Sequence, residues 1–460
     1  MSARQAPSPR HSASLDPVRL RAARVLLQWL SQKGYVREIL SEFESEDASQ
    51  PSARTRAVER RRVRELVYGC VRLHGRYDYL LRRLAKQAPQ APVRVALWLG
   101  LHELCELRSP QHAVVSQCVE LTRALQCAHA AGFVNGVLRR VAREGPRAHF
   151  PSAQEDPLEY ALSWLSHPRW LVERWAQILP PDQLLALCEA NNRRPPLVLR
   201  TRAEDRERII AAAQEREWKL LPGRWAENAL VLESRVPAPR VLDELGPFVT
   251  IQDEAAQLVP TLFTNDSIRL ILDLCAAPGG KAAQLAESFG PSATVVALDT
   301  QLSRMRRLLD TRRRLDLANL APLVADGTRP PLLPGSFDAV LVDAPCSGTG
   351  VLARRHEARW RRKPSDLVEL PRLQRELLNS AVELCAFGGI IVYATCSLER
   401  EENEAVVDAV LAEREDLVEL QVPARVPKEL VHDGRLRVWP HLHGCDGAFA
   451  AVLTRKETGS

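Results

Sequence analysis

Four short apolar runs in the C-terminal half of the chain constrain its fold more than any other feature. They cover residues 270–274, 295–298, 339–342 and 390–393, and each leads into a loop that bears Asp, Gly, Pro or Cys. Such runs are typical of strands buried on both faces of a parallel sheet, which binds ligands at the carboxyl ends of its strands. With helical segments between the runs, the pattern predicts an α/β, Rossmann-like domain over residues 246–457.

The N-terminal part of the chain has a helical periodicity instead. Apolar residues recur at spacings of three and four from about residue 15 to residue 143, as in Val63, Leu66, Val67, Cys70 and Val71. This spacing predicts an all-helical domain over residues 16–145. A Ser-, Pro- and Arg-rich arm over residues 1–15 is expected to be disordered.

Two smaller segments separate these domains. Repeated prolines divide residues 146–185, which predicts a series of short connecting helices. Residues 186–245 are mixed, with strands expected at 197–200 and 229–232 and a helical run at 204–217 between them. We therefore expect a small α+β subdomain before the Rossmann-like domain.

Composition limits the class of protein only broadly. The 460 residues are 45% hydrophobic, which is enough to form several cores, and the formal net charge is +6. Only seven of the 63 basic residues are Lys. Arg binds phosphate with a planar fork, so the excess favours a polyanionic partner, although codon bias in a GC-rich genome would produce the same excess.

The cysteines and the N-terminus indicate a cellular compartment. Ten Cys are spread between Cys70 and Cys445 without a CxxC pair, which favours reduced thiols in a cytoplasm. The first residues have no apolar core, so a secretory signal is not expected. No stretch approaches 18 apolar residues, so no membrane span is expected either.

Residues 271–287, ILDLCAAPGGKAAQLAE, predict a strand, a turn of small residues and the start of a helix. Such a turn lets backbone N–H groups approach a ligand at a helix N-terminus. Ala277 replaces the middle Gly of a dinucleotide fingerprint, and Cys275 and Ala282 break the ATP-binding P-loop pattern. Because Asp299 and Asp326 end the next two strands, where acids accept hydrogen bonds from ribose, we expect an adenosine-containing ligand.

Two further strands each lead to a thiol. Asp343 and Cys346 follow one apolar run, and Cys396 follows the next, so all three are expected to meet at one edge of the sheet. Carbon 5 of cytosine is a poor nucleophile, but a thiolate that adds at carbon 6 makes it enamine-like. A nearby carboxyl group would stabilise charge that develops at N3. Position alone leaves open which thiol is the nucleophile.

These segments resemble a known family. LDLCAAPGGK, DAPCSGTG and YATCS, preceded by IQDEAAQ, are similar to motifs of the RNA cytosine-5 methyltransferases that share the Fmu/Sun catalytic module. LVYGCVR, NGVLRR and NNRRPP in the N-terminal half resemble the 16S rRNA methyltransferase B (RsmB) branch. The resemblance covers about residues 16–455. One departure is Ala282, which stands where Thr is frequent after the Lys of the first motif.

The resemblance implies a multidomain enzyme that uses S-adenosyl-L-methionine. Its parts would be an all-α NusB-like RNA-binding domain, an RRM-like subdomain and a Rossmann-like methyltransferase, and its product 5-methylcytosine at position 967 of 16S rRNA. In RNA enzymes of this family the Thr-Cys-Ser thiol, here Cys396, is the nucleophile, and the Pro-Cys thiol, here Cys346, assists release of the adduct. Asp343 completes the implied catalytic set. The implied cofactor contacts are Cys275, Ala276, Ala277, Pro278, Gly279, Gly280, Lys281, Asp299, Asp326 and Asp343.

A basic segment follows the first thiol and is a candidate RNA contact. Its arginines can bind phosphates while its Trp stacks on a base, although a solvated surface would have the same composition. The predicted RNA-binding residues are Arg354, Arg355, Trp360, Arg361 and Arg362. Weaker candidates lie at residues 60–62, 82–83, 304–307 and 312–314.

No metal site is expected. His441, His443 and Cys445 have the wrong spacing for an ordinary zinc site, and no second ligand pair lies near them in sequence. The proposed chemistry needs no metal. We expect a monomer.

Three alternatives remain. The same chemistry could act on tRNA or 23S rRNA, but the helical N-terminal half favours 16S rRNA. A non-catalytic NusB-like RNA-binding or assembly factor would not need the small-residue turn and both thiols. Methyltransferases of protein glutamine or adenine N6 place a motif such as Asn-Pro-Pro-Tyr where this chain has Asp343-Ala344-Pro345-Cys346.

Overall fold

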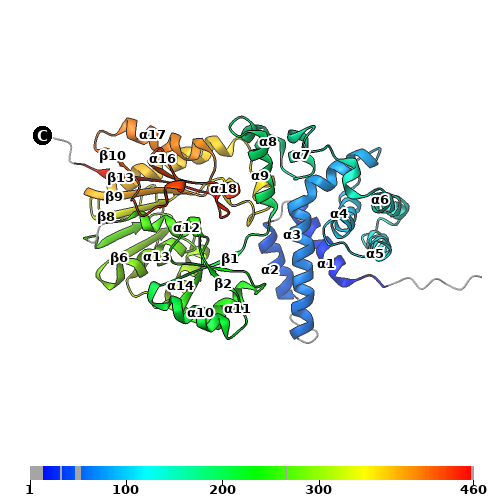
Figure 1. Ribbon diagram of the computed structural model, residues 1–460, viewed down its shortest axis with the longest axis horizontal. Helices are drawn as coiled ribbons and strands as arrows, with labels where there is room; N and C mark the ends of the chain where they lie inside the picture. The colour runs from blue at the N-terminus through cyan, green and yellow to red at the C-terminus, as the bar shows by residue number, and fades with distance from the viewer. Residues whose placement is uncertain (1–13, 32–33, 47–52, 265–266, 457–460) are drawn as a thin grey trace, which may run out of the picture. The chain divides into compact units, whose positions relative to one another are not determined.

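The structure, a computed structural model, describes residues 14–31, 34–46, 53–264 and 267–456 (Figure 1). The chain forms two compact units that divide between Cys188 and Glu189. The arm predicted at residues 1–15 falls almost entirely outside the described residues. Within those residues, no helix is long and apolar enough to cross a membrane.

The first unit is all-helical, as its periodicity predicts. Asp16 caps the first helix by accepting a hydrogen bond from the N–H of Val18 at 2.9 Å. Gly69 allows two helices to cross closely, because a Cβ there would lie 2.1 Å from Nε2 of His102. The six helices of this part are α1 (Pro17–Leu30), α2 (Val36–Glu46), α3 (Ala53–Leu84), α4 (Ala91–Cys105), α5 (Gln111–Ala124) and α6 (Ala131–Glu144).

Prolines begin the short connecting helices rather than interrupt them. Pro157 and Pro181 each occupy the first position of a helix, where the missing N–H has no intrahelical role. The connecting helices are α7 (Pro157–Ser163), α8 (Arg169–Ala176) and α9 (Pro181–Asn192). The last of these continues past residue 185, where the sequence pattern predicts its end.

The small subdomain is a four-stranded antiparallel sheet in the order β2-β3-β1-β4. Its elements are β1 (Leu197–Thr201), α10 (Arg206–Gln214), β2 (Leu220–Pro222), β3 (Ala229–Leu232), α11 (Ala238–Leu245) and β4 (Val249–Ile251). This βαββαβ sequence is the ferredoxin-like arrangement. Strand β4 lies beyond the predicted end of the subdomain at residue 245, yet it pairs with β1.

The catalytic domain is built on a second, larger sheet. Its strands are β5 (Leu270–Asp273), β6 (Thr294–Asp299), β7 (Leu320–Val324), β8 (Phe337–Asp343), β9 (Cys385–Thr395), β10 (Leu417–Leu420), β11 (Val431–His432), β12 (Arg435–Val438) and β13 (Ala448–Arg455). The order is β11-β12-β13-β9-β8-β5-β6-β7, and β10 also pairs with β13. Strands β5 to β9 run parallel, and β10 to β13 add antiparallel pairs.

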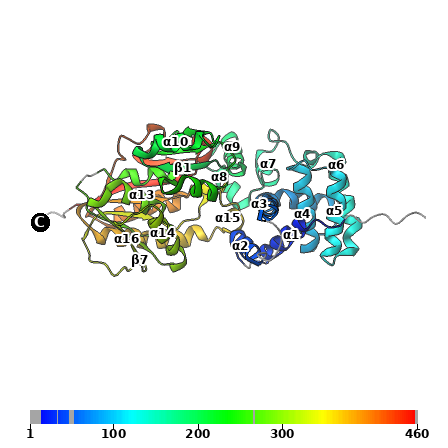
Figure 2. The same cartoon turned by 90° about the horizontal axis from the view of Figure 1, so that it is seen from below.

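Helices cover both faces of this sheet (Figures 1 and 2). They are α12 (Glu254–Leu258), α13 (Gly280–Phe289), α14 (Leu302–Arg314), α15 (Ala358–Arg361), α16 (Asp366–Leu384), α17 (Glu404–Glu413) and α18 (Pro440–His443). Residues of α12, α13 and α14 share one apolar core with the sheet, and residues of α16 and α17 share the other. The chain reverses its direction of winding at β5, between β6 and β8, and ligands of such sheets bind at that point.

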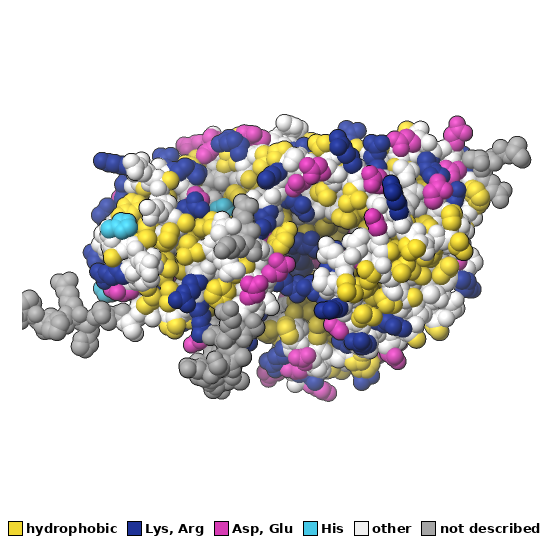
Figure 3. Space-filling model, turned by 180° about the vertical axis from the view of Figure 1, so that it is seen from behind, with side chains coloured by type: hydrophobic (Ala, Val, Ile, Leu, Met, Phe, Trp, Pro, Cys, Tyr) yellow, Lys and Arg dark blue, Asp and Glu magenta, His cyan; other side chains and the backbone are white. Residues whose placement is uncertain are grey.

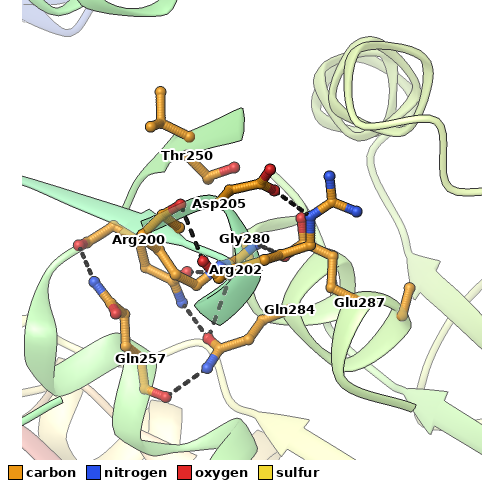
Figure 4. A network of polar contacts seen from close by, with 12 residues as sticks. Arg200, Arg202, Asp205, Thr250, Gln257, Gly280, Gln284 and Glu287 are labelled. Atoms are coloured by element: carbon orange, nitrogen blue, oxygen red, sulfur yellow. Dashed lines mark hydrogen bonds and ion pairs between the residues drawn. The ribbon is translucent and has the colours of Figure 1, made fainter. Parts of the chain in front are cut away.

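A buried arginine joins the small sheet to helix α13 (Figure 4). Arg200 of β1 is 3% exposed, and its guanidinium donates to the carbonyl oxygen of Gly280 at 2.8 Å. It also pairs with Glu287 at 2.5 Å and donates a short hydrogen bond to Gln252. Gly280 begins α13, so the small subdomain contacts the helix that closes the small-residue turn.

Candidate active site

The small-residue turn connects β5 to α13 and has the shape of a ligand cradle. Gly279 adopts φ +106°, and a Cβ there would lie 2.9 Å from the side chain of Leu308. Only glycine therefore fits this position without displacing α14. Ala276 and Ala277 are buried, and the first N–H groups of α13 lack intrahelical partners because they begin the helix.

Asp299, at the end of β6, braces this turn. Its Oδ2 accepts a hydrogen bond from the N–H of Ala277 at 3.2 Å, and its Oδ1 accepts one from Gln301 at 2.9 Å. The side chain is buried, and each oxygen keeps a lone pair beyond these bonds. The guanidinium of Arg304 lies 3.6 Å from it. Asp299 thus stands beside the turn, as the sequence predicts.

Asp273, at the end of β5, is a site residue that the sequence analysis missed. It is fully buried, and neither carboxylate oxygen has a hydrogen-bond partner among the described residues. Burial and the nearby carboxylate of Asp343 raise its pKa to about 8. The available signal was an acid that closes an apolar strand, as Asp299 and Asp343 do. A buried acid without partners, beside a cradle, fits a ligand that carries positive charge.

Asp326 is different from the other acids. It lies two residues past the end of β7, is exposed, and accepts hydrogen bonds from the N–H and hydroxyl of Thr328, both at 2.9 Å. These bonds lower the pKa of Asp326. Its contacts are those of a local turn, and its predicted contact with the cofactor stays a prediction.

The two thiols expected to meet do so. Sγ of Cys346 lies 3.3 Å from Sγ of Cys396, and the loops that carry them are also joined by a hydrogen bond from the N–H of Gly350 to the carbonyl of Cys396 at 2.9 Å. The sulfur contact lowers the pKa of Cys396, and the charges of Arg355 and Lys281 lower it further. The same contact, burial and the charge of Glu402 raise the pKa of Cys346. The pKa of Cys396 is thus lowered and that of Cys346 is raised, and for each thiol the contact with the other sulfur is the largest cause.

Lys281 and Asp343 form an ion pair beside the thiols. Nζ of Lys281 lies 2.7 Å from Oδ2 of Asp343, at the end of β8. Lys281 belongs to the first turn of α13, so the pair links the cradle to the strand that precedes Cys346. Its ammonium group and the carboxylate act on Cys396 with opposite sign.

Most of the predicted RNA-binding side chains contact the protein instead. Arg354 pairs with Asp253 and Asp446, both at 2.7 Å. Arg362 donates to the carbonyls of Cys346 and Ser347 at 3.1 and 3.0 Å, and Arg361 pairs with Glu357 at 3.2 Å. Trp360 is half-buried, and Arg355 is exposed. RNA binding by this segment stays a prediction, and its arginines have a structural use that the sequence did not reveal.

The His441, His443 and Cys445 segment has ordinary contacts. Nδ1 of His443 accepts a hydrogen bond from the N–H of Trp439 at 2.9 Å. Over the part of the chain that the structure describes, no group of three or more His, Cys, Asp or Glu side chains could hold a metal ion.

Three family descriptions match successive parts of the chain. "NusB family" matches residues 16–143, "Methyltr_RsmF/B-like, ferredoxin-like domain" matches residues 167–239, and "16S rRNA methyltransferase RsmB/F" matches residues 261–454. They follow the order of the helical unit, the small sheet and the larger sheet.

Named relatives extend the similarity over most of the chain. The chain is 34% identical over 405 residues to "Ribosomal RNA small subunit methyltransferase B" of Escherichia coli (strain SMS-3-5 / SECEC), which covers 86% of this chain and 90% of the relative. It is 32% identical over 407 residues to "Probable ribosomal RNA small subunit methyltransferase B" of Bacillus subtilis (strain 168), with 85% and 90% covered.

Solved structures show the same fold at lower identity. "Crystal Structure of PH0851" matches with a TM-score of 0.77 and 23% identity over 96% of this chain and 100% of that chain. "The crystal structure of NSun6 from Pyrococcus horikoshii with SFG" matches with a TM-score of 0.53 and 17% identity over 63% and 98%. With its helical unit, ferredoxin-like sheet and cradle-bearing catalytic sheet in matching order, this chain belongs to the 16S rRNA methyltransferase RsmB/F family.

Proposed function

We propose that this enzyme forms 5-methylcytosine at position 967 of 16S rRNA, with S-adenosyl-L-methionine as methyl donor and Cys396 as nucleophile. The observation that carries the proposal is the contact between the two thiols, 3.3 Å apart, with unlike surroundings. The cations Arg355 and Lys281 lower the pKa of Cys396 and anionic Asp343 opposes them, whereas the charged side chain that acts on Cys346 is anionic Glu402. A thiolate at Cys396 and a thiol at Cys346 follow from that difference.

The residues around the cradle fit the proposed cofactor. The turn presents the first N–H groups of α13, which have no intrahelical partners, and Asp299 can accept hydrogen bonds from the ribose of the cofactor. Asp273 offers a buried, unpartnered carboxyl to the positive end of the molecule. When bound, the cofactor supplies an electrophilic methyl group on a sulfonium. Asp326 is proposed as a more distant contact.

Cys396 starts the reaction by adding to carbon 6 of the target cytosine. The new C–S bond breaks the aromaticity, and the electron pair of the carbon 5–carbon 6 double bond moves toward N3 and carbon 5. Asp343 and Lys281, paired at 2.7 Å, stand where a carboxyl and an ammonium group can stabilise the base through N3 and its neighbours. Carbon 5 would then take the methyl group that the sulfonium supplies, and the cofactor would be left as a neutral thioether.

Release requires the reverse of the first bond. A base takes the proton from carbon 5, the C–H electron pair re-forms the carbon 5–carbon 6 double bond, and the C–S bond breaks so that the sulfur of Cys396 leaves as a thiolate. Cys346, the neighbouring thiol, is the group placed to assist this step by donating a hydrogen bond to that sulfur. The target base must leave its stack to reach the two loops.

The test uses Cys396→Ala and Cys346→Ala with a short 16S rRNA fragment and the cofactor. We expect Cys396→Ala to lose methylation while still binding cofactor, and Cys346→Ala to accumulate a covalent RNA–protein adduct on denaturing gels. Cys385→Ala is the matched control, because Cys385 is a fully buried thiol in the same domain whose surroundings are apolar. If Cys396→Ala traps RNA instead, the two roles are reversed.

The target is tested separately in cells. Bisulfite mapping of rRNA from a deletion strain should show loss of methylcytosine at the small-subunit position. Persistence there, with loss in tRNA or 23S rRNA, would leave the chemistry intact and overturn the target.

A further inference from the structure

One buried carboxylate receives hydrogen bonds from both thiol-bearing loops. Glu402 is fully buried and lies in a short turn after the Cys396 loop. Its Oε1 accepts from the N–H of Ser347 at 2.7 Å and from Nε2 of Gln374 at 3.1 Å. Its Oε2 accepts from the hydroxyl of Ser397 at 2.5 Å and from that of Ser347 at a shorter distance.

The two serines occupy equivalent places. Ser347 directly follows Cys346, and Ser397 directly follows Cys396. Their hydroxyl oxygens are 3.1 Å apart, as the two sulfurs are 3.3 Å apart. The carboxylate of Glu402 therefore holds the two Cys-Ser pairs together through hydrogen bonds to their serines. We call Glu402, Ser347 and Ser397 the thiol clamp.

We propose that Glu402 is a positioning residue that holds the two thiols in contact, so that one adds to the base while the other assists its release. The proposal rests on the function proposed above. Glu402 touches neither the substrate nor the reacting sulfur atoms, and it acts through the backbone of the two loops. A buried carboxylate is retained only with a full set of donors, and all four donors here come from the two loops or from the helix that packs on them.

The shape and charge of glutamate are both required. The two oxygens of a carboxylate accept several hydrogen bonds, whereas a glutamine amide offers one oxygen and directs an NH₂ group at the remaining donors. Glu402→Gln therefore turns its NH₂ group toward the two serine hydroxyls, which must rotate to accept from it, and the charge-assisted hydrogen bonds of the carboxylate are lost. Glu402→Asp keeps the charge but withdraws it by one methylene, so it cannot reach both loops at once.

Other contacts keep the loops folded when the clamp is lost. Gly350 donates to the carbonyl of Cys396, and Arg362 donates to the carbonyls of Cys346 and Ser347. The hydroxyl of Thr349 accepts from the N–H of Leu398 at 2.9 Å. The variant is thus expected to fold with its thiols displaced rather than to lose the domain.

The kinetic test compares Glu402→Gln with Glu404→Gln in the full chain. Glu404 lies two residues away, at the start of α17, and pairs with Arg437, so its variant removes one negative charge near Glu402 in sequence without touching the clamp. A displacement of the reacting group by about 1 Å costs roughly 100-fold in rate, which is the loss of kcat we expect for Glu402→Gln. KM for RNA and cofactor should change by less than about threefold, because binding groups are untouched.

The thiols themselves give the second readout. Iodoacetamide labelling of Cys396 across a pH series, followed by peptide mass spectrometry, should shift to higher pH in Glu402→Gln, because the sulfur contact that favours the thiolate is lost. Cys385 and Cys188 are fully buried and report unfolding by becoming labelled. The double variant Ser347→Ala/Ser397→Ala should reproduce the defect and add little to Glu402→Gln.

The outcomes separate the two proposals. If the wild-type chain forms neither adduct nor methylcytosine, the proposed function fails. If the wild type is active and Glu402→Gln matches Glu404→Gln in rate and labelling, the clamp is refuted. A rate loss accompanied by labelling of Cys385 and Cys188 also overturns it, because the defect is then unfolding. A rate loss with an unchanged labelling profile of Cys396 does the same.

Discussion

Arg355 differs from Arg354, Arg361 and Arg362 because its charge acts on a thiol, that of Cys396. Its side chain is exposed. Its charge lowers the pKa of Cys396, and among the groups that lower this pKa only the hydrogen bond from Cys346 has a larger effect. Arg355→Gln should therefore raise that pKa, and the rising limb of the pH–rate profile should move to higher pH. Because the charge is screened by solvent, the shift should be less than about one pH unit.

The matched control is Arg361→Gln, whose wild-type side chain pairs with Glu357. Single-turnover methyl transfer measured between pH 6 and 9 should show an unmoved limb for this variant (a range that brackets the ordinary thiol pKa of about 8.5). A shift toward lower pH in Arg355→Gln would contradict the assignment of Cys396 as the ionised thiol.

Asp273 gives a prediction about stability and pH, because burial raises the pKa of its carboxyl group. Below the ordinary aspartate value of 3.8, folded and unfolded chains both hold the proton, so the group does not affect stability. Between pH 3.8 and about pH 8 only the folded chain keeps the proton on Asp273. The wild-type chain therefore loses stability as pH rises through this range. Asp273→Asn stays neutral, and its melting temperature without cofactor should exceed that of the wild type by a margin that grows up to about pH 8.

Cofactor binding should move in the other direction. Asp273→Asn cannot ionise, so it cannot supply the negative charge that Asp273 would gain by releasing its proton when a positively charged cofactor binds. The cofactor should therefore stabilise this variant less than it stabilises the wild type. The control is Asp326→Asn, because Asp326 is exposed and its pKa is lowered. The difference in melting temperature between this variant and the wild type should not grow from pH 5 to 8. Equal margins for Asp273→Asn at every pH would refute the buried, protonated state.

For single residues, the sequence predicts which side chains follow the ends of strands, but not which partners they contact. Cys346, Cys396 and Asp343 could be expected to meet because each follows an apolar run and the strand ends of one sheet converge. The role of Glu402 could not be expected, because its four donors come from loops 55 and five residues away and from helix α16. The arginines after Cys346 were visible as charge, but the carboxylates and carbonyls that bind them are distant in sequence.

At the scale of elements, β1 and α13 are joined through Arg200, whose side chain is 3% exposed. Arg200→Gln leaves Glu287, whose side chain is 13% exposed, without its partner and removes the donor to Gly280. Breaking a buried pair in this way costs about 3 kcal/mol. We expect a lower melting temperature and faster hydrogen exchange in β1 and in the first turn of α13.

The control is Arg202, which directly follows the last residue of β1 (Figure 4). It pairs with Asp205 at 2.9 Å, but its side chain is 42% exposed. An exposed pair contributes at most about 1 kcal/mol, so Arg202→Gln should leave exchange in α13 unchanged. Equal effects from both variants would show that the small sheet and α13 are not coupled through Arg200.

The elements that could be predicted are the long and strongly patterned ones. The helices of the first unit and the five parallel strands follow from periodicity and apolar runs. Strands β2 and β11 have three and two residues, too few for any period, and they form only because β3 and β12 pair with them. Strand β4 follows residue 245, where the sequence pattern ends the small subdomain. It belongs to the small sheet because it pairs with β1, and such pairing cannot be read from sequence order.

At the scale of the whole molecule, charge is divided unequally between the two units. Residues 1–188 contain 27 Lys and Arg against 18 Asp and Glu, an excess of nine positive charges, whereas the remaining chain contains 36 against 39. The net positive charge of +6 therefore belongs to the helical unit. On the face drawn in Figure 3, Lys and Arg side chains lie in several groups separated by acidic and apolar ones.

This division predicts that the helical unit supplies most of the salt-dependent affinity for RNA. A fragment that begins at Pro181, so that α9 stays whole, keeps the cradle, both thiols and the clamp. It should bind cofactor as the full chain does and bind a 16S rRNA fragment far more weakly. Each lost phosphate contact lowers the slope of log affinity against log salt by about 0.7 to 0.9, so the slope should also become shallower.

The measurement is RNA binding by the full chain and the fragment over a salt series, with cofactor-induced thermal stabilisation as the check that the fragment is folded. At high salt the two affinities should converge, because the contribution being removed is electrostatic. If the folded fragment keeps the slope of the full chain, phosphate contacts lie in the catalytic unit despite its net negative charge. The exposed arginines of α14 and the segment after Cys346 would then be the first to examine.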